Sequence, residues 1–211
     1  AFNNHIEKIN LHVDYDNPMH NTYLTVGTIN NKIYTINGLE IDNTTKNDTL
    51  AISAHFRGGK DQGDYFDLSF YHTINPKGQS VFGIKRSGIL FDNNLWYVNH
   101  ENDDRNRVVM EDNFDNIRID SLVLNHNEEF IRMAGVVKDS TYKDVHLNFE
   151  NVKLSHFIQN VDSLEVMGRI NGNLSLKQEK GNYFPSSTIK VNGLVLNHVP
   201  YGDFALDIIG N

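Results

Sequence analysis

The chain has 211 residues, of which 39% are hydrophobic and 10% aromatic, enough for a folded core and too many for a disordered chain. A net charge of -8 argues against nucleic acid as a partner, because phosphate binding needs a basic surface. The sequence contains no cysteine, so disulfides are excluded, and periplasmic, extracellular and cytosolic locations all stay open.

The sequence contains no apolar run of the roughly 20 residues that a membrane-spanning helix needs, and no signal peptide. It starts at Ala1 without a methionine and stops at the residues IIGN. We therefore expect a fragment of a larger protein, in which an anchor or a targeting segment would lie outside this stretch.

Alternation of apolar and polar residues dominates the chain, and no helical stripe of useful length occurs, which predicts an all-β fold. The clearest predicted strands in the first two thirds of the chain are Leu50–Phe56, Tyr65–Tyr71, Ser80–Lys85, Glu129–Val137 and Asp144–Leu154. The predicted turns are Gly58–Asp64, Asn75–Gly78, Phe91–Asn94 and Lys138–Lys143. A charged loop is expected at Asn99–Arg107, and a short helical turn near His156–Asn160.

The segment Leu164–Leu176 alternates without a break, with an apolar residue or glycine at every even position. As one strand it would be roughly 43 Å long, so it is either a very long strand or a bent one. Gly168 and Gly172 both fall on the apolar side, where missing side chains permit curvature. We expect a sheet curled over its own apolar face.

The word LVLNH occurs twice, at Leu122–His126 and Leu194–His198, and two looser relatives lie at Ile36–Ile41 and Val161–Val166. All four place Asn or Asp with Gly or Ser between a leading Ile or Val and a Leu-x-aliphatic pair. The odd spacing would send the leading residue to the opposite face unless a bulge or bend absorbs one residue. The word therefore predicts a kinked β-strand, used in an elongated meander, although chance recurrence of common residues is the alternative.

The run Val161–Asn211 resembles the TamB family, the translocation and assembly module subunit of Gram-negative envelopes. The matching elements are the strand Gly168–Leu176, a turn with Pro185, the strand Ile189–Asn197 and the Gly-Asp step within Tyr201–Leu206. The block Phe114–Phe157 looks like the preceding unit of the same array. Together these favour an upstream β-sheet section at residues 1–113 and a TamB-like repeat section, continuous with it, at residues 114–211.

The resemblance implies a fold and a function. TamB-like proteins are anchored in the inner membrane and extend through the periplasm as a β-sheet curled into a taco-like trough with an apolar interior. The family is linked to outer-membrane protein assembly with a barrel partner of the TamA type, and to phospholipid movement between the two membranes. This chain would be a periplasmic, non-enzymatic section of such a trough, with phospholipid acyl chains as ligand and the inner-membrane anchor outside it.

The candidate groove lining is the apolar phase of the last strands. Its residues are Leu164, Val166, Ile170, Leu174, Leu176, Ile189, Val191, Leu194, Leu196, Phe204, Leu206 and Ile208. An acyl chain gains about 0.8 kcal/mol for each buried methylene and needs no directional polar contact, which suits a groove. The alternative is that the same residues form the core of a closed β-sandwich, because alternation alone does not distinguish an open face from a sealed one.

Two other functions stay open. Trp96 and Tyr97, with Asp92, Asn93, Asn94 and Asn99 around them, form an aromatic and amide set suited to a glycan-binding module. A purely structural spacer that docks a barrel partner edge to edge is the third possibility. We expect no cofactor, no catalytic residues and no metal site, because the histidines lack an HExxH or other paired spacing and Glu101, Asp103 and Asp104 lack the order of an EF-hand loop.

Overall fold

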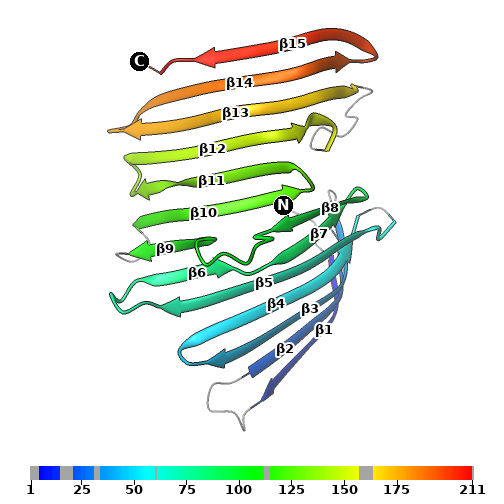
Figure 1. The fold of residues 1–211 in the computed structure, drawn as a ribbon. Helices are drawn as coiled ribbons and strands as arrows, with labels where there is room; N and C mark the ends of the chain where they lie inside the picture. Colours follow the sequence, from blue (N-terminus) through cyan, green and yellow to red (C-terminus); the bar gives the residue numbers. More distant parts are fainter. Residues whose placement is uncertain are drawn as a thin grey trace. The chain divides into compact units, whose positions relative to one another are not determined.

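The computed structural model describes residues 5–14, 21–30, 34–59, 61–111, 115–156 and 164–210. These residues form strands β1 to β15 and one 3-10 turn, η2, and contain no α-helix (Figure 1). None of the described residues belongs to a helix that could cross a membrane. The chain divides into two compact units, residues 1–107 and residues 108–211, so the boundary lies slightly before the predicted one at 113/114.

Unit 1 contains eight strands in its described residues, all paired antiparallel. The strands are β1 (His5–Asp14), β2 (Asn21–Asn30), β3 (Thr35–Lys46), β4 (Thr49–Gly58), β5 (Asp64–Ile74), β6 (Ser80–Ile84), β7 (Ser87–Phe91) and β8 (Asn94–Val98). Strands β1 to β6 follow one another as a meander. Strand β7 pairs with the first part of β5 and β6 with its last part, and β8 then pairs with β7.

Unit 2 contains a second antiparallel meander, β10 to β15, in which each strand pairs with the next one along the chain. Its elements are β10 (Asn116–His126), β11 (Glu129–Lys138), β12 (Tyr142–Lys153), η2 (Leu154–His156), β13 (Val166–Glu179), β14 (Asn182–Leu196) and β15 (Val199–Ile208). Strand β9 (Arg107–Glu111) spans the boundary between the units. The prediction of an all-β antiparallel meander is thus confirmed.

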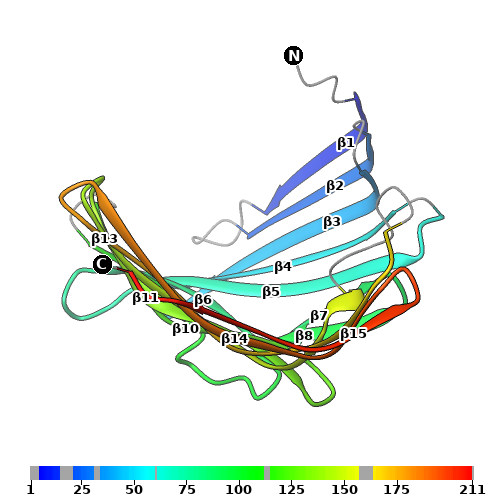
Figure 2. The same cartoon turned by 90° about the horizontal axis from the view of Figure 1, so that it is seen from above.

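All five strands predicted in the first two thirds of the chain are present, as β4, β5, β6, β11 and β12. Of the alternating segment Leu164–Leu176, the residues from Val166 onwards form part of the 14-residue strand β13, and Leu164 and Glu165 precede it. The helical turn expected near His156–Asn160 is the single 3-10 turn η2, and residues 157–160 lie outside the described residues. Seen from above, the strands of unit 2 are bowed along their length, with η2 on the inner side of the bow (Figure 2).

The predicted bulges are confirmed in the three described copies of the repeated word. The strand register shifts between Asn37 and Glu40, between Ile119 and Leu122, and between Val191 and Leu194. Each shift inserts one residue at the Asn/Asp-Gly/Ser pair, so the leading aliphatic residue and the following leucine face the same side. Part of the fourth copy, at Val161–Val166, lies outside the described residues.

Each unit is a single layer with chemically different faces. In unit 1, Leu11, Leu24, Ile41, Ala54 and Leu68 are successive register partners across five strands. A second row of partners includes Phe56 and Phe66, whose rings stack with centroids 4.4 Å apart. Within each unit, the described strands pack beside their hydrogen-bonded neighbours and no second sheet covers them. The closed sandwich considered from the sequence is therefore not formed within either unit.

Candidate functional site

The register of unit 2 gathers apolar side chains from successive strands on one side of the sheet, because residues directly opposite each other share a face. One row of partners is Phe149, Gly172, Ile189 and Leu206, and the next row is Val152, Ile170, Val191 and Phe204. We define the apolar face of unit 2 as the residues Leu122, Leu124, Ile131, Met133, Val145, Leu147, Phe149, Val152, Ile170, Leu174, Leu176, Ile189, Val191, Phe204, Leu206 and Ile208.

The apolar face is partly accessible to solvent. Its centre is well packed, since Val152 is 1% exposed and Val191 is 8% exposed. Towards β15 the exposure rises, and Phe204 is 47% exposed. Most of the remaining members are half-buried, because the described part of unit 2 supplies no second layer over them. Apolar area of this kind is left for a ligand or a partner to cover.

The structure brings together most of the predicted groove residues. Eight of them belong to the apolar face as defined by register: Ile170, Leu174, Leu176, Ile189, Val191, Phe204, Leu206 and Ile208. Val166 and Leu196 are register partners beyond the bulge, and alternation along β13 keeps Val166 on the same side as Ile170. Leu194 follows the bulge and pairs with Gly202. Leu164 is an exposed residue that precedes β13 and lies outside the ladder.

A bulge in β12 keeps Phe149 and Val152 on the same face. The register shifts between them, and Asn151 has a positive φ of 56°. Two side chains of β13 hold this irregular backbone: the Asn171 Oδ1 accepts a hydrogen bond of 2.8 Å from the Asn151 N–H, and the Arg169 Nη1 donates one of 3.0 Å to the Asn151 carbonyl. Two polar side chains of the alternating segment, Arg169 and Asn171, therefore stabilise the bulge that keeps Phe149 and Val152 on the apolar face.

The opposite face of unit 2 is mainly polar. Arg132 and Glu150 form an ion pair of 2.8 Å across β11 and β12, and His146 contacts Ser175 at 2.8 Å across β12 and β13. Lys177 lies on the same side, and its hydrogen bond to Glu179 raises the pKa of the ammonium group. Across β12 and β13 this face has the composition of a solvated surface, while Val123, Phe130 and Val136 add apolar side chains to it at β10 and β11.

Several residues of the glycan-binding set considered from the sequence, and the acidic residues that follow it, have structural roles in β8 and the loop after it. Trp96 is 5% exposed, so its ring is not accessible for stacking on a sugar. Asn99 is buried, and its amide donates to the Ile84 and Asp103 carbonyls and accepts from the Asp103 N–H. The Asp103 carboxylate is paired with Arg105 at 2.6 Å. The loop is held by its own side chains, and two members of the glycan-binding set, Trp96 and Asn99, are buried.

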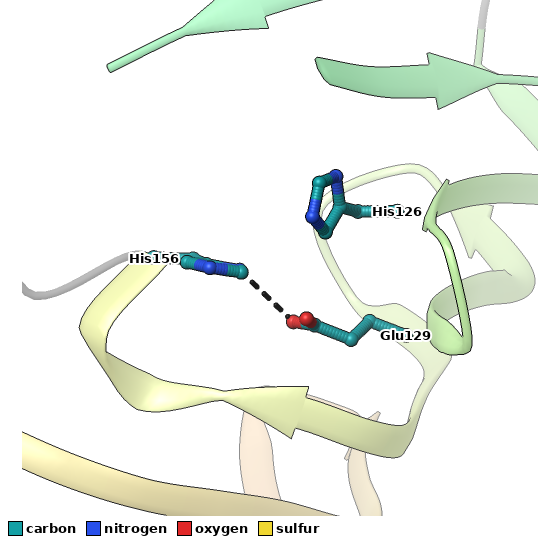
Figure 3. A group of neighbouring side chains, drawn as sticks. All are labelled: His126, Glu129 and His156. Carbon is teal, nitrogen blue, oxygen red and sulfur yellow. Dashed lines mark hydrogen bonds and ion pairs between the residues drawn. The ribbon is translucent and has the colours of Figure 1, made fainter. Parts of the chain in front are cut away.

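Three side chains that the sequence did not single out meet in unit 2: His126, Glu129 and His156 (Figure 3). His126 and Glu129 are register partners that flank the tight turn between β10 and β11, and η2 brings His156 to them. The H-x-x-E spacing at His126 and Glu129 was visible in the sequence. The third member depends on where β12 ends, which spacing does not reveal.

Comparisons with models of known protein families, with curated proteins and with solved structures found no match to this chain.

Proposed function

We propose that this chain is a non-enzymatic section of a TamB-like envelope protein, and that the apolar face of unit 2 binds phospholipid acyl chains. The observation that supports this most is the half-exposed row of aliphatic and aromatic side chains that crosses β12 to β15. The resemblance of the last two strand pairs to the TamB family suggests the same role.

The energetics suit a ligand that binds without a fixed position. Half-coverage of a 16-carbon tail would contribute roughly 6 kcal/mol at about 0.8 kcal/mol for each methylene. The apolar face presents hydrocarbon from several strands and few polar groups that would fix one orientation. A tail held in this way can slide from one strand to the next along the rows that cross β12 to β15, as movement along a trough requires.

The proposal has a cellular setting that rests on the resemblance. The full-length protein would be anchored in the inner membrane and would cross the periplasm to an outer-membrane barrel of the TamA type. In that setting the chain would carry phospholipid between the membranes, support assembly of outer-membrane proteins, or do both.

A structural spacer is the second candidate function, and a specific observation favours it. Every residue of β15 is exposed, as are most residues of β1, and both are outermost strands of their own units. Outermost strands can pair with a strand of another protein. A spacer would use these backbone edges and would leave the apolar face without a lipid.

Lipid extraction from the purified chain tests the proposal. We expect organic extracts of the unmodified chain, analysed by mass spectrometry, to contain phospholipid in a reproducible molar ratio. The double variant Ile189→Asp with Leu206→Asp places two carboxylates in one row of the apolar face and should reduce that ratio about tenfold or more, because a charge opposes an acyl chain there.

The matched control changes the same two strands on the polar face. Thr188→Asp with Ala205→Asp introduces the same charge one position away and should leave the lipid ratio unchanged. Circular dichroism of both double variants would confirm that the strands are retained. Absence of lipid from the unmodified chain, or equal loss in the two double variants, would exclude lipid binding at this face and favour the spacer.

A further inference from the structure

One end of the apolar face of unit 2 carries three potential metal ligands. His126 is the last residue of β10 and Glu129 the first of β11, so the two stand opposite each other across the hairpin turn. His156 ends η2, directly after β12. One ligand atom from each side chain lies within 4.8 Å of the other two (Figure 3).

The three groups surround a common point. The His156 Nδ1 is 3.0 Å from the Glu129 Oε2. The rings of His126 and His156 are nearly perpendicular, at 88°, with centroids 5.1 Å apart, so they meet edge to face and do not stack. In a tetrahedral zinc site with bonds of about 2.0–2.1 Å, ligand atoms are about 3.4 Å apart. Small side-chain rotations would therefore close this cluster around an ion.

Burial of the carboxylate is an independent reason to expect a cation. Glu129 is 3% exposed, and a carboxylate is rarely buried without compensation for its charge. Its Oε2 accepts a hydrogen bond of 2.9 Å from the Lys153 N–H, and the Lys153 ammonium, on a side chain that is 42% exposed, stands 3.9 Å from Oε1, at the long end of the range for an ion pair. A divalent cation between the three side chains would compensate the carboxylate directly.

We propose that His126, Glu129 and His156 form a binding site for Zn²⁺. Two imidazole nitrogens and one carboxylate oxygen are a ligand set that zinc accepts, with a water molecule completing the tetrahedron. On binding, His126 would exchange its present contact of 3.0 Å between Nε2 and the Asn127 Nδ2 for the metal or turn its other nitrogen to it. The ion would fasten η2 to the β10–β11 hairpin. This site does not depend on lipid binding.

Calorimetric titration of the untagged, chelator-treated chain with ZnCl2 tests the site. We expect one equivalent to bind, and the affinity to fall about 10- to 100-fold or more in each of His126→Gln, Glu129→Gln and His156→Gln, since each removes a ligand. Zinc should raise the melting temperature of the unmodified chain and leave that of the three variants unchanged. Cobalt(II) in place of zinc should give the visible absorption of a tetrahedral site.

The matched control is His146→Gln, which removes a histidine of the polar face that contacts Ser175 and Asp144 in the same unit. This variant should bind zinc as the unmodified chain does. Zinc affinities equal to the control in all three ligand variants would overturn the proposal. A second result would also overturn it: the unmodified chain binds zinc no more tightly than Glu129→Gln does, and Glu129→Gln lowers the melting temperature in the absence of zinc. The cluster would then be a metal-free ion pair.

Discussion

Asparagine and aspartate side chains hold the irregular backbone of this chain. The Asn75 Oδ1 accepts hydrogen bonds from the Lys77 and Gln79 N–H groups, and the Asp139 Oδ1 accepts one from the Thr141 N–H. In the loop before β9, the Asn99 Oδ1 accepts a hydrogen bond from the Asp103 N–H, and the Asn99 Nδ2 donates one to the Asp103 carbonyl. Short polar side chains close such turns because they reach backbone groups two to four residues away. The abundance of these residues in the sequence therefore reflects its many turns.

The first prediction concerns the Asp103 carboxyl. Hydrogen bonds from Arg105 lower its pKa from 3.8 to about 2. A carboxyl with a lowered pKa stabilises the folded loop above the unfolded value, and this stabilisation is lost as the pH falls from about 4 to about 2. NMR titration of the carboxyl carbons should give a midpoint near 2 for Asp103, and Arg105→Gln should move it back towards 3.8.

Asp139 is the internal control for this titration. Hydrogen bonds from Thr141 also lower its pKa, and Arg105 is not among the groups responsible. The Asp139 midpoint should stay low in the Arg105→Gln variant. An Asp103 midpoint that does not move in that variant would show that Arg105 is not the cause.

The second prediction concerns Val152, the most buried member of the apolar face. Val152→Ala should lower the free energy of unfolding by about 2 kcal/mol, because it removes two methyl groups from a packed site. Val199→Ala, in the exposed strand β15, should change it by less than about 0.5 kcal/mol. Urea unfolding of both variants gives the comparison. Equal effects would mean that the centre of the apolar face is not packed as described.

At the scale of the element, the strands of unit 2 combine length with local irregularity. Strand β14 pairs with β13 over almost its whole length, yet the register shifts within each of the pairs β12–β13, β13–β14 and β14–β15. Bulges let a long strand bend while keeping its apolar residues on one side. The bowed strands seen in Figure 2 are consistent with this arrangement.

The third prediction concerns Gly172, which has a φ of +126° in the middle of β13. A Cβ at this position would lie 2.0 Å from the Thr188 carbonyl oxygen of β14, closer than real Cβ contacts. Gly172→Ala should therefore destabilise the chain by about 3 kcal/mol, from backbone strain and from displacement of β14. Chemical denaturation measures the loss.

Gly88→Ala is the control for this substitution. Gly88 also lies within a strand, it has no positive φ, and its added Cβ would meet the Tyr97 ring at an ordinary 3.9 Å. The effect should stay within about 1 kcal/mol. A similar loss in both variants would mean that any glycine in a strand of this fold is equally sensitive, and that the geometry at Gly172 is not the reason.

At the scale of the whole molecule, an acidic chain carries an incompletely covered apolar surface. The net charge of -8 opposes association at neutral pH, and the pI is near 5.6. Exposed apolar area favours contact between molecules once charge repulsion is removed. Solubility should therefore depend on pH more strongly than it would for a chain with a covered core.

The fourth prediction follows from that balance. Sedimentation velocity should show larger species at pH 5.6 than at pH 8 for the unmodified chain. Phe204→Ser with Leu206→Ser, which reduces the apolar face at its most exposed strand, should shrink this difference. A pH dependence that is the same in the unmodified chain and the double variant would place the association elsewhere on the molecule.

The sequence by itself determined the fold class, and it indicated a long or bent strand after Leu164 and a bulge or bend in the repeated word. These features depend on the order of apolar and polar residues along the chain, and such local patterns are visible without coordinates. The predicted groove residues Ile170, Leu174, Ile189 and Leu206 likewise share a face because alternation fixes their side once the bulges are counted.

The tertiary structure decided what depends on distant pairing. The two copies of LVLNH end differently: His126 still belongs to β10 and points to the cluster with Glu129, whereas His198 lies in the turn before β15 and pairs with Glu165 at 3.0 Å. Neither the burial of Trp96 nor the approach of His156 to the β10–β11 hairpin could be predicted from the sequence. The two identical LVLNH segments differ in structure because each strand ends where its pairing with the neighbouring strand ends. That neighbouring strand is a different part of the chain in each case.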